Sequence, residues 1–567
     1  MLFFWSVLLT IALAAVAPLR PWLVQVTVDQ DILQGNMPGL MNMTLIMLAL
    51  LALQTIIQYN HTYLTNSLGQ VVILDMRTQT FNHILSLRLK FFDKTPLGQL
   101  ITRTISDLET IADVFSEGLI EIVGSLLQII AILIFMFWSD FKLTLVVLIP
   151  IPFFIAGTIV FQNAIKIAFQ TVRHEVAQLN TFLQEHITGV SIIQLFNREE
   201  QELKKFKAIN KRYRDANISS NFYYSIFFPF VEVIMAFSIG LLVWYGSHRI
   251  IHSSVSPGIV VSFIMYLNLL FRPIRELADK FNTLQMGMVS ADRIFRLLDT
   301  KETTSDTGTY APAAFSGAIT FDHVWFAYND DQYVLKDISF EVEAGQTVAL
   351  VGATGAGKSS TINLLTRFYE INSGQIRIDG VDIKDYSLEY LRSRITTVMQ
   401  DVFLFSDTIA NNISLKNPAI TREAIMRAAE EVGAADFISR LPENYDFNVM
   451  ERGGTLSVGQ AQLLSFIRAL VYDPAILVLD EATSSVDSET EEMIQQAIFK
   501  LMNGRTSLVI AHRLSTVQHA DRILVLDKGE ILESGNHQEL LRLNGHYKRL
   551  YDLQFNSAGL NISSERQ

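Results

Sequence analysis

The chain has 567 residues, of which 50% are hydrophobic and only 18% are charged, and its mean hydropathy is +0.28. This composition is too apolar for an ordinary soluble protein and indicates membrane spans in a chain of more than one domain. The net charge of −12 gives no reason to expect nucleic-acid binding, and the absence of cysteine excludes disulfides, thiolate catalysis and cysteine-based zinc sites.

The first half contains six apolar runs, each long enough for a bilayer core, which takes roughly 20 helical residues. The first run ends in an A-x-A-like pattern, as a signal peptide does, but it lacks a basic n-region and its cleavage would leave five spans. Because no polar leader precedes it, we expect that the natural chain starts earlier or that this version is short. The expected spans are Leu2–Val26, Leu40–Tyr63, Phe115–Trp138, Leu143–Phe161, Tyr223–Tyr245 and Ile259–Leu277.

Basic residues predict how the spans are oriented. The long loops after the second and fourth spans are rich in lysine and arginine, whereas the short loops between the other spans hold few basic residues. By the positive-inside rule, the two long loops and the C-terminal half are cytoplasmic. We therefore expect a multi-pass protein of the cytoplasmic (inner) membrane.

One ionisable residue, Glu232, lies inside the fifth expected span, three residues after Pro229. A charge within a span is costly and is a functional candidate by default, and the proline loosens the helix. Glu232 is therefore a candidate contact for cationic cargo. The alternative is that it bonds to a neighbouring helix.

From about Pro312 the pattern changes to short apolar runs, bounded by Gly or Asp, that alternate with helical stretches. Such runs are typical of strands buried on both faces, so they predict an α/β domain with a largely parallel sheet. We expect a six-helix all-α transmembrane domain at 1–300, a linker at 301–314, the α/β domain at 315–555 and a polar tail at 556–567.

The stretch "GATGAGKSS" fits the phosphate-loop pattern G-x-x-x-x-G-K-[ST], and it lies between an expected strand, Thr347–Val351, and a helical stretch. Glycines allow backbone N–H groups to surround phosphates, and the helix N-terminus adds partial positive charge. Lys358 is expected at the β- and γ-phosphates of ATP and Ser359 at Mg²⁺. The expected ATP-binding residues of the loop are Gly352, Thr354, Gly355, Gly357, Lys358, Ser359 and Ser360.

Two further strand ends carry candidate catalytic groups. Asp480 closes the run "AILVLD" and is placed to hold Mg²⁺, and Glu481 beside it is the candidate base for the attacking water. His512 follows another apolar run, at the end of a strand where α/β folds place ligands, which favours contact with the γ-phosphate.

These motifs, in their order and spacing, resemble the nucleotide-binding domain of ABC transporters. The membrane half resembles the six-helix exporters of that superfamily, with segments 91–111 and 186–206 similar to their two cytoplasmic loops. The motifs that carry the resemblance are Tyr328, the phosphate loop, Gln400, Glu451, "LSVGQ" at 456–460, "ILVLDE" at 476–481, "SSVD" at 484–487 and His512.

The resemblance implies roles for residues that the motifs alone do not explain. Tyr328 would stack on adenine, Gln400 would contact the γ-phosphate and Mg²⁺, and Glu451 would signal between domains. Asp487 would end the loop that contacts the opposing site. Segments near Thr104–Ala112 and Gly189–Phe196 would be coupling helices that dock on the ATPase domain.

In this family each ATP lies between two ATPase domains, so the resemblance also implies a dimer. The signature of one chain completes the site of the other, and here it consists of Ser457, Val458, Gly459 and Gln460. Val458 replaces the family's glycine and adds bulk where the backbone must come close. One interpretation is tolerated drift. The other, which we favour, is a heterodimer with a second half-transporter whose own site receives this altered signature.

The sequence therefore predicts ATP-driven export of small hydrophobic or lipid substrates by an α/β P-loop ATPase domain fused to a transmembrane domain. One alternative is a homodimeric flippase for lipid A-like molecules. A second is an ATP-gated membrane regulator, which the intact Glu481 disfavours because a gate that only binds ATP needs no base.

Overall fold

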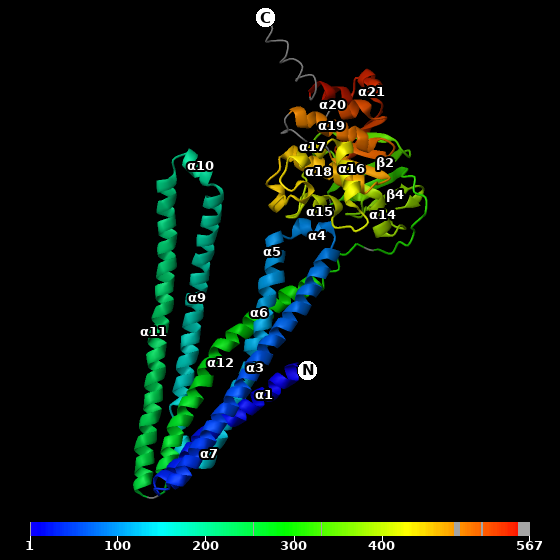
Figure 1. Ribbon diagram of the computed structural model, residues 1–567. Coiled ribbons are helices and arrows are strands. Elements are labelled where there is room, and N and C mark those ends of the chain that lie inside the picture. The colour runs from blue at the N-terminus through cyan, green and yellow to red at the C-terminus, as the bar shows by residue number, and fades with distance from the viewer. Residues whose placement is uncertain are drawn as a thin grey trace. The chain divides into compact units, whose positions relative to one another are not determined.

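The computed structural model describes residues 2–252, 254–304, 306–329, 332–480, 488–511 and 514–553, without the side chains of residues 117, 275–279, 281–282 and 488–490. The chain forms two compact units (Figure 1). The helical unit comprises Met1–Leu85 and Leu97–Thr300. The sheet unit comprises Ser86–Pro96 and Lys301–Gln567.

The helical unit is built from long helices, with short π-helical segments labelled η. Its elements are α1 (Leu2–Val16), α2 (Leu19–Val26), η1 (Thr27–Ile32), α3 (Met37–Ser86), α5 (Leu97–Thr102), η2 (Arg103–Asp107), α6 (Leu108–Asp113), η3 (Val114–Leu119), α7 (Ile120–Ser139), α8 (Phe141–Leu148), α9 (Ile151–Thr188), α10 (Val190–Leu195), α11 (Glu199–Ile251) and α12 (Pro257–Leu298).

Six helical stretches among the described residues are long and apolar enough to cross a membrane, which confirms the six expected spans. Several of them continue well past the apolar run. The second span was expected to end at Tyr63, but α3 continues to Ser86, and α9 and α11 have 38 and 53 residues. Hydropathy shows where a helix stops being apolar, but a helix can continue beyond that point. The expected cytoplasmic loops therefore consist largely of continuations of the spanning helices.

The core of the helical unit is apolar and lies mainly between α7, α8, α9, α11 and α12. A turn between α7 and α8 is fixed by Asp140, whose carboxylate caps α8 by accepting from the Leu143 N–H at 2.8 Å. The same carboxylate pairs with Arg249 of α11 through contacts of 2.5 and 2.6 Å. Both side chains are mostly buried, so this pair ties three helices together at one end of their spans.

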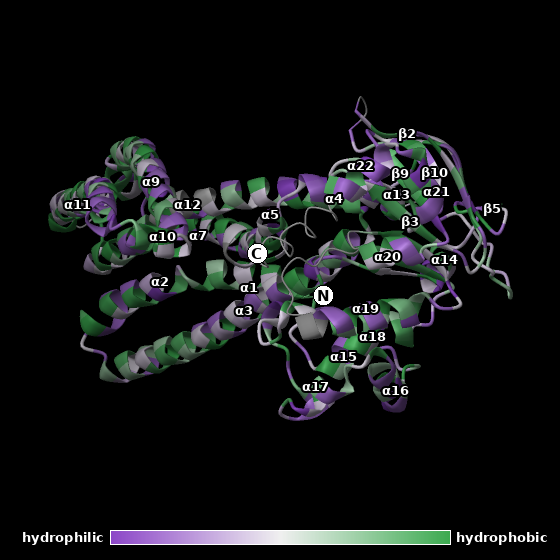
Figure 2. Ribbon diagram, turned by 90° about the horizontal axis from the view of Figure 1, so that it is seen from above, coloured by the Kyte–Doolittle hydropathy of each residue, from purple (hydrophilic) through white to green (hydrophobic). Residues whose placement is uncertain are grey.

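Many large apolar side chains of the helical unit point outward, as lipid-facing side chains do. Figure 2 shows hydrophobic residues, in green, along its helices. Trp138 and Phe153, for example, are 70% and 67% exposed. The spanning helices therefore carry apolar residues on both their packed and outer faces.

The segment expected to be a coupling helix, Thr104–Ala112, lies in the helical unit. That segment belongs to a nearly continuous helical run, α5 to α7, and it buries Leu108, Ile111 and Ala112, the first two in a cluster with Ile294 of α12. In the same segment, Ile105 is 47% exposed. The short helix of this loop is α4 (Leu89–Lys94), which belongs to the sheet unit.

Strands and short helices make up the rest of the sheet unit. After α4 its elements are β1 (Ile319–Ala327), β2 (Tyr333–Val342), β3 (Thr347–Gly352), α13 (Lys358–Leu365), β4 (Ser373–Ile378), β5 (Val381–Asp382), α14 (Leu388–Arg394), β6 (Ile395–Val398), α15 (Ile409–Ser414), α16 (Arg422–Val432), α17 (Ala435–Ser439), η4 (Asn444–Asp446), η5 (Glu451–Gly453), α18 (Val458–Val471), β7 (Ile476–Asp480), α19 (Ser488–Met502), β8 (Thr506–Ile510), α20 (Leu514–His519), β9 (Arg522–Asp527), β10 (Glu530–Gly535), α21 (His537–Leu543) and α22 (His546–Tyr551).

Two sheets organise this unit. The larger has the strand order β10-β9-β3-β8-β7-β6 and is parallel except for β10. The smaller is antiparallel, in the order β2-β1-β4-β5. The α/β class and the largely parallel sheet predicted from sequence are confirmed. The separate antiparallel sheet was not predicted, although its strand β2 alternates buried and exposed residues, unlike the continuously buried strands β3, β7 and β8.

The parallel strands are buried on both faces. Along β3, Ala349 and Val351 belong to one apolar cluster, whereas Val348 and Leu350 belong to another. Strands β7, β8 and β9 divide their residues between the same two clusters, as the two-residue period of a strand requires. This burial fixes the register and hence the level at which the strands end.

Candidate active site

The predicted phosphate- and magnesium-binding residues that the structure describes lie where the parallel strands end. Strands β3, β8 and β7 are neighbours, and their register puts Leu350, Ile510 and Asp480 at one level. Ligands of open α/β sheets bind at this carboxyl edge. The phosphate loop follows β3, and Gln400 is exposed two residues after the end of β6. The fold therefore places both beside Asp480.

The phosphate loop requires glycine at two positions for different reasons. Gly357 has a φ of +105°, and a Cβ there would lie 2.5 Å from the Leu335 side chain. A Cβ on Gly352 would come within 2.2 Å of a backbone oxygen of the neighbouring strand β9. Gly355 also has a positive φ, but a Cβ there would meet no atom within 4 Å. Thr354 beside it is exposed. The loop is therefore tight at its ends and open in its middle, where phosphates can approach the backbone.

Lys358 begins α13 and folds back over the loop. Its ammonium group donates to the carbonyl oxygens of Gly352 at 2.7 Å and Ala353 at 3.0 Å. Burial lowers the pKa of Lys358, while the Asp480 carboxylate acts in the opposite direction. A partly desolvated ammonium held beside a helix N-terminus is well suited to bind phosphate.

Tyr328 lies at the end of β1 and is half buried. Its ring packs edge-on against Tyr369 at 5.0 Å between centroids, and its hydroxyl is 3.0 Å from Oγ of Ser360. Ser360 is buried in the first turn of α13, whereas Ser359 beside it is exposed. The platform expected for adenine is thus joined directly to the phosphate-binding helix.

The signature segment starts α18, and its side chains cap that helix. Ser457 accepts from the Gln460 N–H at 3.2 Å, and the Gln460 side chain accepts from the Ser457 N–H at 3.0 Å. Gly459 is buried, and Val458 is 62% exposed on the first turn. Val458 has ordinary helical backbone geometry, and its branched side chain adds bulk on the outer side of the helix.

Three predicted residues, Glu481, Asp487 and His512, lie outside the described residues. Glu451 is exposed in a short helical turn just before the signature. Glu232 is exposed on α11 and is not among the residues that line a cavity of about 690 Å³ between α1, α2, α3, α7 and α12.

Sequence reasoning missed a polar group beside the adenine platform. The hydroxyl of Tyr369 donates to Asp93 of α4 at 2.6 Å, and burial, followed by this carboxylate, raises the pKa of Tyr369. A cavity of about 440 Å³ is lined by Tyr328, Asn329, Tyr369, Asp93, Lys90 and Lys94. Tyr369 lies close enough to the phosphate loop in sequence to have been suspected, but nothing local links it to residues 90–94.

Comparison with known proteins gives the same picture for both halves. Residues 3–274 match the family described as ABC transporter transmembrane region, and residues 335–484 match the family described as ABC transporter. The uncharacterized ABC transporter ATP-binding protein YknV of Bacillus subtilis (strain 168) is 41% identical over 496 residues, which is 87% of this chain and 82% of the relative. The chain belongs to the ABC transporter family.

Other relatives place this ABC transporter among the exporters. It is 38% identical, over 94% of its length and 80% of the relative's, to the probable multidrug resistance ABC transporter ATP-binding/permease protein YheH of the same bacterium. It is 35% identical to the ATP-dependent lipid A-core flippase of Desulfotalea psychrophila (strain LSv54 / DSM 12343), over 96% and 95% of the two chains.

A solved structure of a bacterial Atm1-family ABC exporter with ATP bound shares the fold, with a TM-score of 0.79, 29% identity and 97% of each chain covered. The protein is thus an exporter-type half-transporter, with a six-helix membrane region and an ATPase domain in one chain. Its ATP hydrolysis is coupled to transport.

Proposed function

We propose that this half-transporter pairs with a second one in the cytoplasmic membrane and exports hydrophobic or amphipathic substrates. The observation that carries the proposal is the carboxyl edge of the parallel sheet. There, the phosphate loop, the partly desolvated Lys358 and Asp480 lie close together, and the described residues of the same chain include six candidate spans. One polypeptide therefore carries both the residues for ATP hydrolysis and the helices of a membrane pathway.

Mg²⁺ fits the donors at this edge. Ser359, Asp480 and Gln400 offer a hydroxyl, a carboxylate and an amide oxygen, which are the hard ligands that Mg²⁺ prefers, usually with phosphates completing the shell. When bound with ATP, Mg²⁺ would neutralise charge on the phosphates. Lys358 would bind the β- and γ-phosphates, and Glu481 would accept a proton from the attacking water.

The second half-transporter is proposed to differ from this chain. Val458 presents a branched apolar side chain on the exposed first turn of α18, where the family signature meets the partner's nucleotide. That bulk weakens the partner's site and leaves the site built on Lys358 intact. If the chain purified alone forms a stable dimer that traps nucleotide and vanadate equally at two sites, the unequal pair is excluded.

The orientation can be tested cleanly because the chain has no cysteine, so an introduced cysteine is unique. We expect a membrane-impermeant maleimide to label Asn36→Cys in intact cells, since this residue lies between the first two spans. Lys384→Cys in the sheet unit should be labelled only after lysis. Labelling of Lys384→Cys in intact cells would reverse the proposed orientation.

Two alternatives remain distinguishable by experiment. A homodimeric flippase for lipid A-like molecules is favoured by the name of one relative, and it predicts two equivalent sites and movement of lipid alone. An ATP-gated regulator predicts negligible hydrolysis that vanadate does not affect. We expect instead vanadate-sensitive hydrolysis by the assembled complex, at a rate that rises with substrate.

A further inference from the structure

The helical unit holds a cavity of about 690 Å³ between α1, α2, α3, α7 and α12. Close packing of α1 on α7 forms one wall, because a Cβ on Gly124 would come within 2.8 Å of the Thr10 side chain. The cavity is polar for a membrane region. Its described lining includes Arg20, Gln54, Gln58, His61, Glu121, Gln128, Asn268, Arg272 and Lys280.

Arg20 is the most telling of these residues because it lies within the first candidate span. Charged residues in spans are costly and almost always face a cavity or the interior of the bundle. No hydrogen bond or ion pair joins Arg20 to another residue in the described part of the chain. Its backbone is nonetheless well anchored, since the buried Tyr266 of α12 donates its hydroxyl to the Pro18 carbonyl at 3.0 Å.

The charge of the cavity favours an anion. Among the described lining residues, Glu121 is the single carboxylate, and it pairs with Lys280 at 2.6 Å. Arg20, on the same lining, has no such carboxylate partner in the described part of the chain. Among the lining side chains that the structure describes, a cationic head would meet no uncompensated carboxylate, whereas an acidic head would meet the guanidinium of Arg20.

The polar side chains around Arg20 are partly fixed. Thr10 donates its hydroxyl proton to the Ser6 carbonyl at 2.7 Å, so at its 3.0 Å contact with His61 it accepts from the Nε2–H of the ring. The His61 ring is buried and held in one orientation. A preorganised wall of this kind reduces the cost of ordering when a polar head binds.

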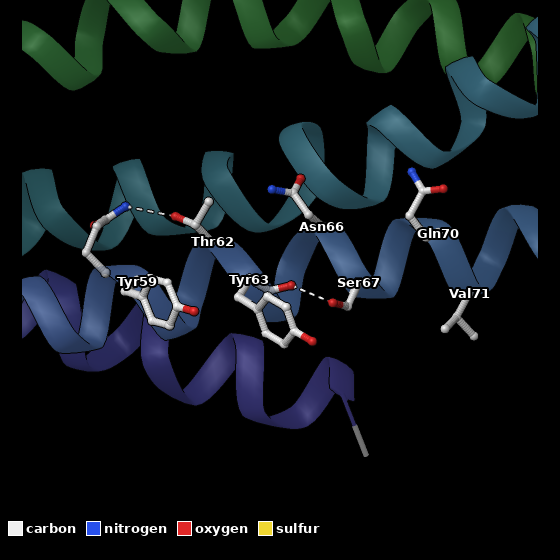
Figure 3. Close-up of a pocket in the computed structure, with 8 residues that line it drawn as sticks. Tyr59, Thr62, Tyr63, Asn66, Ser67, Gln70 and Val71 are labelled. Atoms are coloured by element: carbon white, nitrogen blue, oxygen red, sulfur yellow. Dashed lines mark hydrogen bonds between the residues drawn. The ribbon is translucent and has the colours of Figure 1, made fainter.

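A second feature gives the apolar part of the ligand a place. Gln58 lines both the cavity and a neighbouring open groove of about 810 Å³ along α3. Figure 3 shows the rings of Tyr59 and Tyr63 side by side along this groove. The rings are nearly parallel, with centroids 6.5 Å apart, and are 70% and 63% exposed. Aromatic faces next to a polar cavity suit a molecule with an acidic head and an apolar body.

We propose that this cavity binds amphipathic anions, with Arg20 contacting the acidic head and the groove of Tyr59 and Tyr63 holding the apolar body. The inference rests on the proposed export function and specifies its substrate class. The head is a phosphate or sulfonate-like acid, and it can belong to a membrane lipid or to a molecule from the aqueous phase. This anionic substrate class differs from the cationic cargo that Glu232 suggests in the sequence.

The test uses the full-length transporter, purified as the dimer of its native membrane and reconstituted into phosphatidylcholine vesicles. ATP hydrolysis and probe movement are measured with 8-anilinonaphthalene-1-sulfonate, with fluorescently labelled phosphatidylglycerol and with the cation rhodamine 6G. The variants are Arg20→Gln, Arg20→Lys and, as a matched control, Arg214→Gln. Arg214 is exposed on α11, pairs with Asp215 and lies outside the cavity.

We expect an anionic probe to stimulate the wild type, the lipid if the source is the membrane and the sulfonate if it is the aqueous phase. Arg20→Gln should raise the half-maximal concentration of that probe at least about tenfold, as loss of a charge-assisted hydrogen bond does. Arg20→Lys should restore part of the response. Arg214→Gln should behave as the wild type, and hydrolysis without probe should be unchanged in all variants.

Two results would overturn the inference, and they separate it from the proposed function. If the wild type moves rhodamine 6G with ATP but neither anion, the export function stands and the anion cavity is wrong. The same holds if Arg20→Gln responds to the anion as the wild type does. If the wild type moves none of the three probes with ATP, the export function itself fails and the inference falls with it.

Discussion

The two units bury their residues in opposite ways. In the sheet unit, neighbouring residues of β3 such as Val348 and Ala349 are both inaccessible to solvent, and the polar site lies at the strand ends. In the helical unit, Trp138 is 70% exposed whereas Thr65 and His61 are buried. Apolar side chains can face lipid, so the interior of the membrane unit can hold polar groups that are available to bind a substrate. The two units therefore hide and display their functional groups differently.

Close packing in the two units can be compared by adding a methyl group at a glycine. We expect the largest effect on ATP binding and stability at Gly357. Gly357→Ala should abolish ATP binding and lower the free energy of unfolding by about 3 kcal/mol, because it adds a positive-φ strain to a backbone and side-chain overlap. Isothermal titration with ATP and thermal melting of the detergent-solubilised chain measure both. Unimpaired ATP binding would mean that the loop is not the phosphate site.

A glycine-to-alanine change in the helical unit should destabilise the protein less than Gly357→Ala does. Gly124→Ala places its Cβ against one methyl group of Thr10, so we expect a loss of about 1 kcal/mol, or a fall of about 2–4 °C in Tm. Gly240→Ala is the control, because its Cβ meets nothing within 4 Å and helix propensity favours alanine. A fall in Tm for Gly240→Ala as large as that for Gly124→Ala would contradict the proposed close packing of α1 on α7.

The phosphate loop lies between a strand and a helix, as its sequence pattern predicts, because such a loop is a local backbone pattern. Gly357 and Lys358 are adjacent in the chain, and the apolar strands around them set where they lie. The cavity around Arg20 is different, since its walls come from five helices spread between Thr10 and Lys280. No spacing in the sequence predicts which helix faces meet, so the sequence singled out Glu232 and gave no signal for Arg20.

The link between Asp93 and Tyr369 was missed for the same reason. Residues 86–96 are far from the sheet unit in sequence, yet Arg88 donates to the Thr303 carbonyl at 2.6 Å and Asp93 accepts from Tyr369. Periodicity identifies a short helix there but not the unit against which it packs. In the segment 104–112, likewise, sequence periodicity does not show that Leu108, Ile111 and Ala112 are buried within the helical unit.

Removing the hydrogen bond between Tyr369 and Asp93 should have an effect of intermediate size on the stability of α4. Tyr369→Phe removes the hydrogen bond to Asp93, so α4 should open more often, by about 0.5–1.5 kcal/mol. Hydrogen exchange of the Leu89–Lys94 amides measures this opening. Tyr333→Phe, which has an exposed ring on β2, serves as the control. Unchanged exchange in Tyr369→Phe would show that the bond does not hold α4.

The smallest effect is expected at the signature. Val458→Ala keeps the helix and removes the branched bulk, so stability should change by less than about 1 kcal/mol while hydrolysis at the partner's site rises. Site-specific trapping with vanadate in the assembled complex distinguishes the two sites. Equal trapping at both sites in the wild type would contradict the role assigned to Val458.

The claim that both units serve one process is tested most directly by ATP-driven transport in inverted membrane vesicles that contain the full-length transporter. Lys358→Ala should lower ATP-dependent uptake of a transported probe at least about 100-fold, because the ammonium that binds the phosphates is lost. The exposed Lys384→Ala should leave uptake unchanged. Equal uptake by wild type and Lys358→Ala would contradict the account.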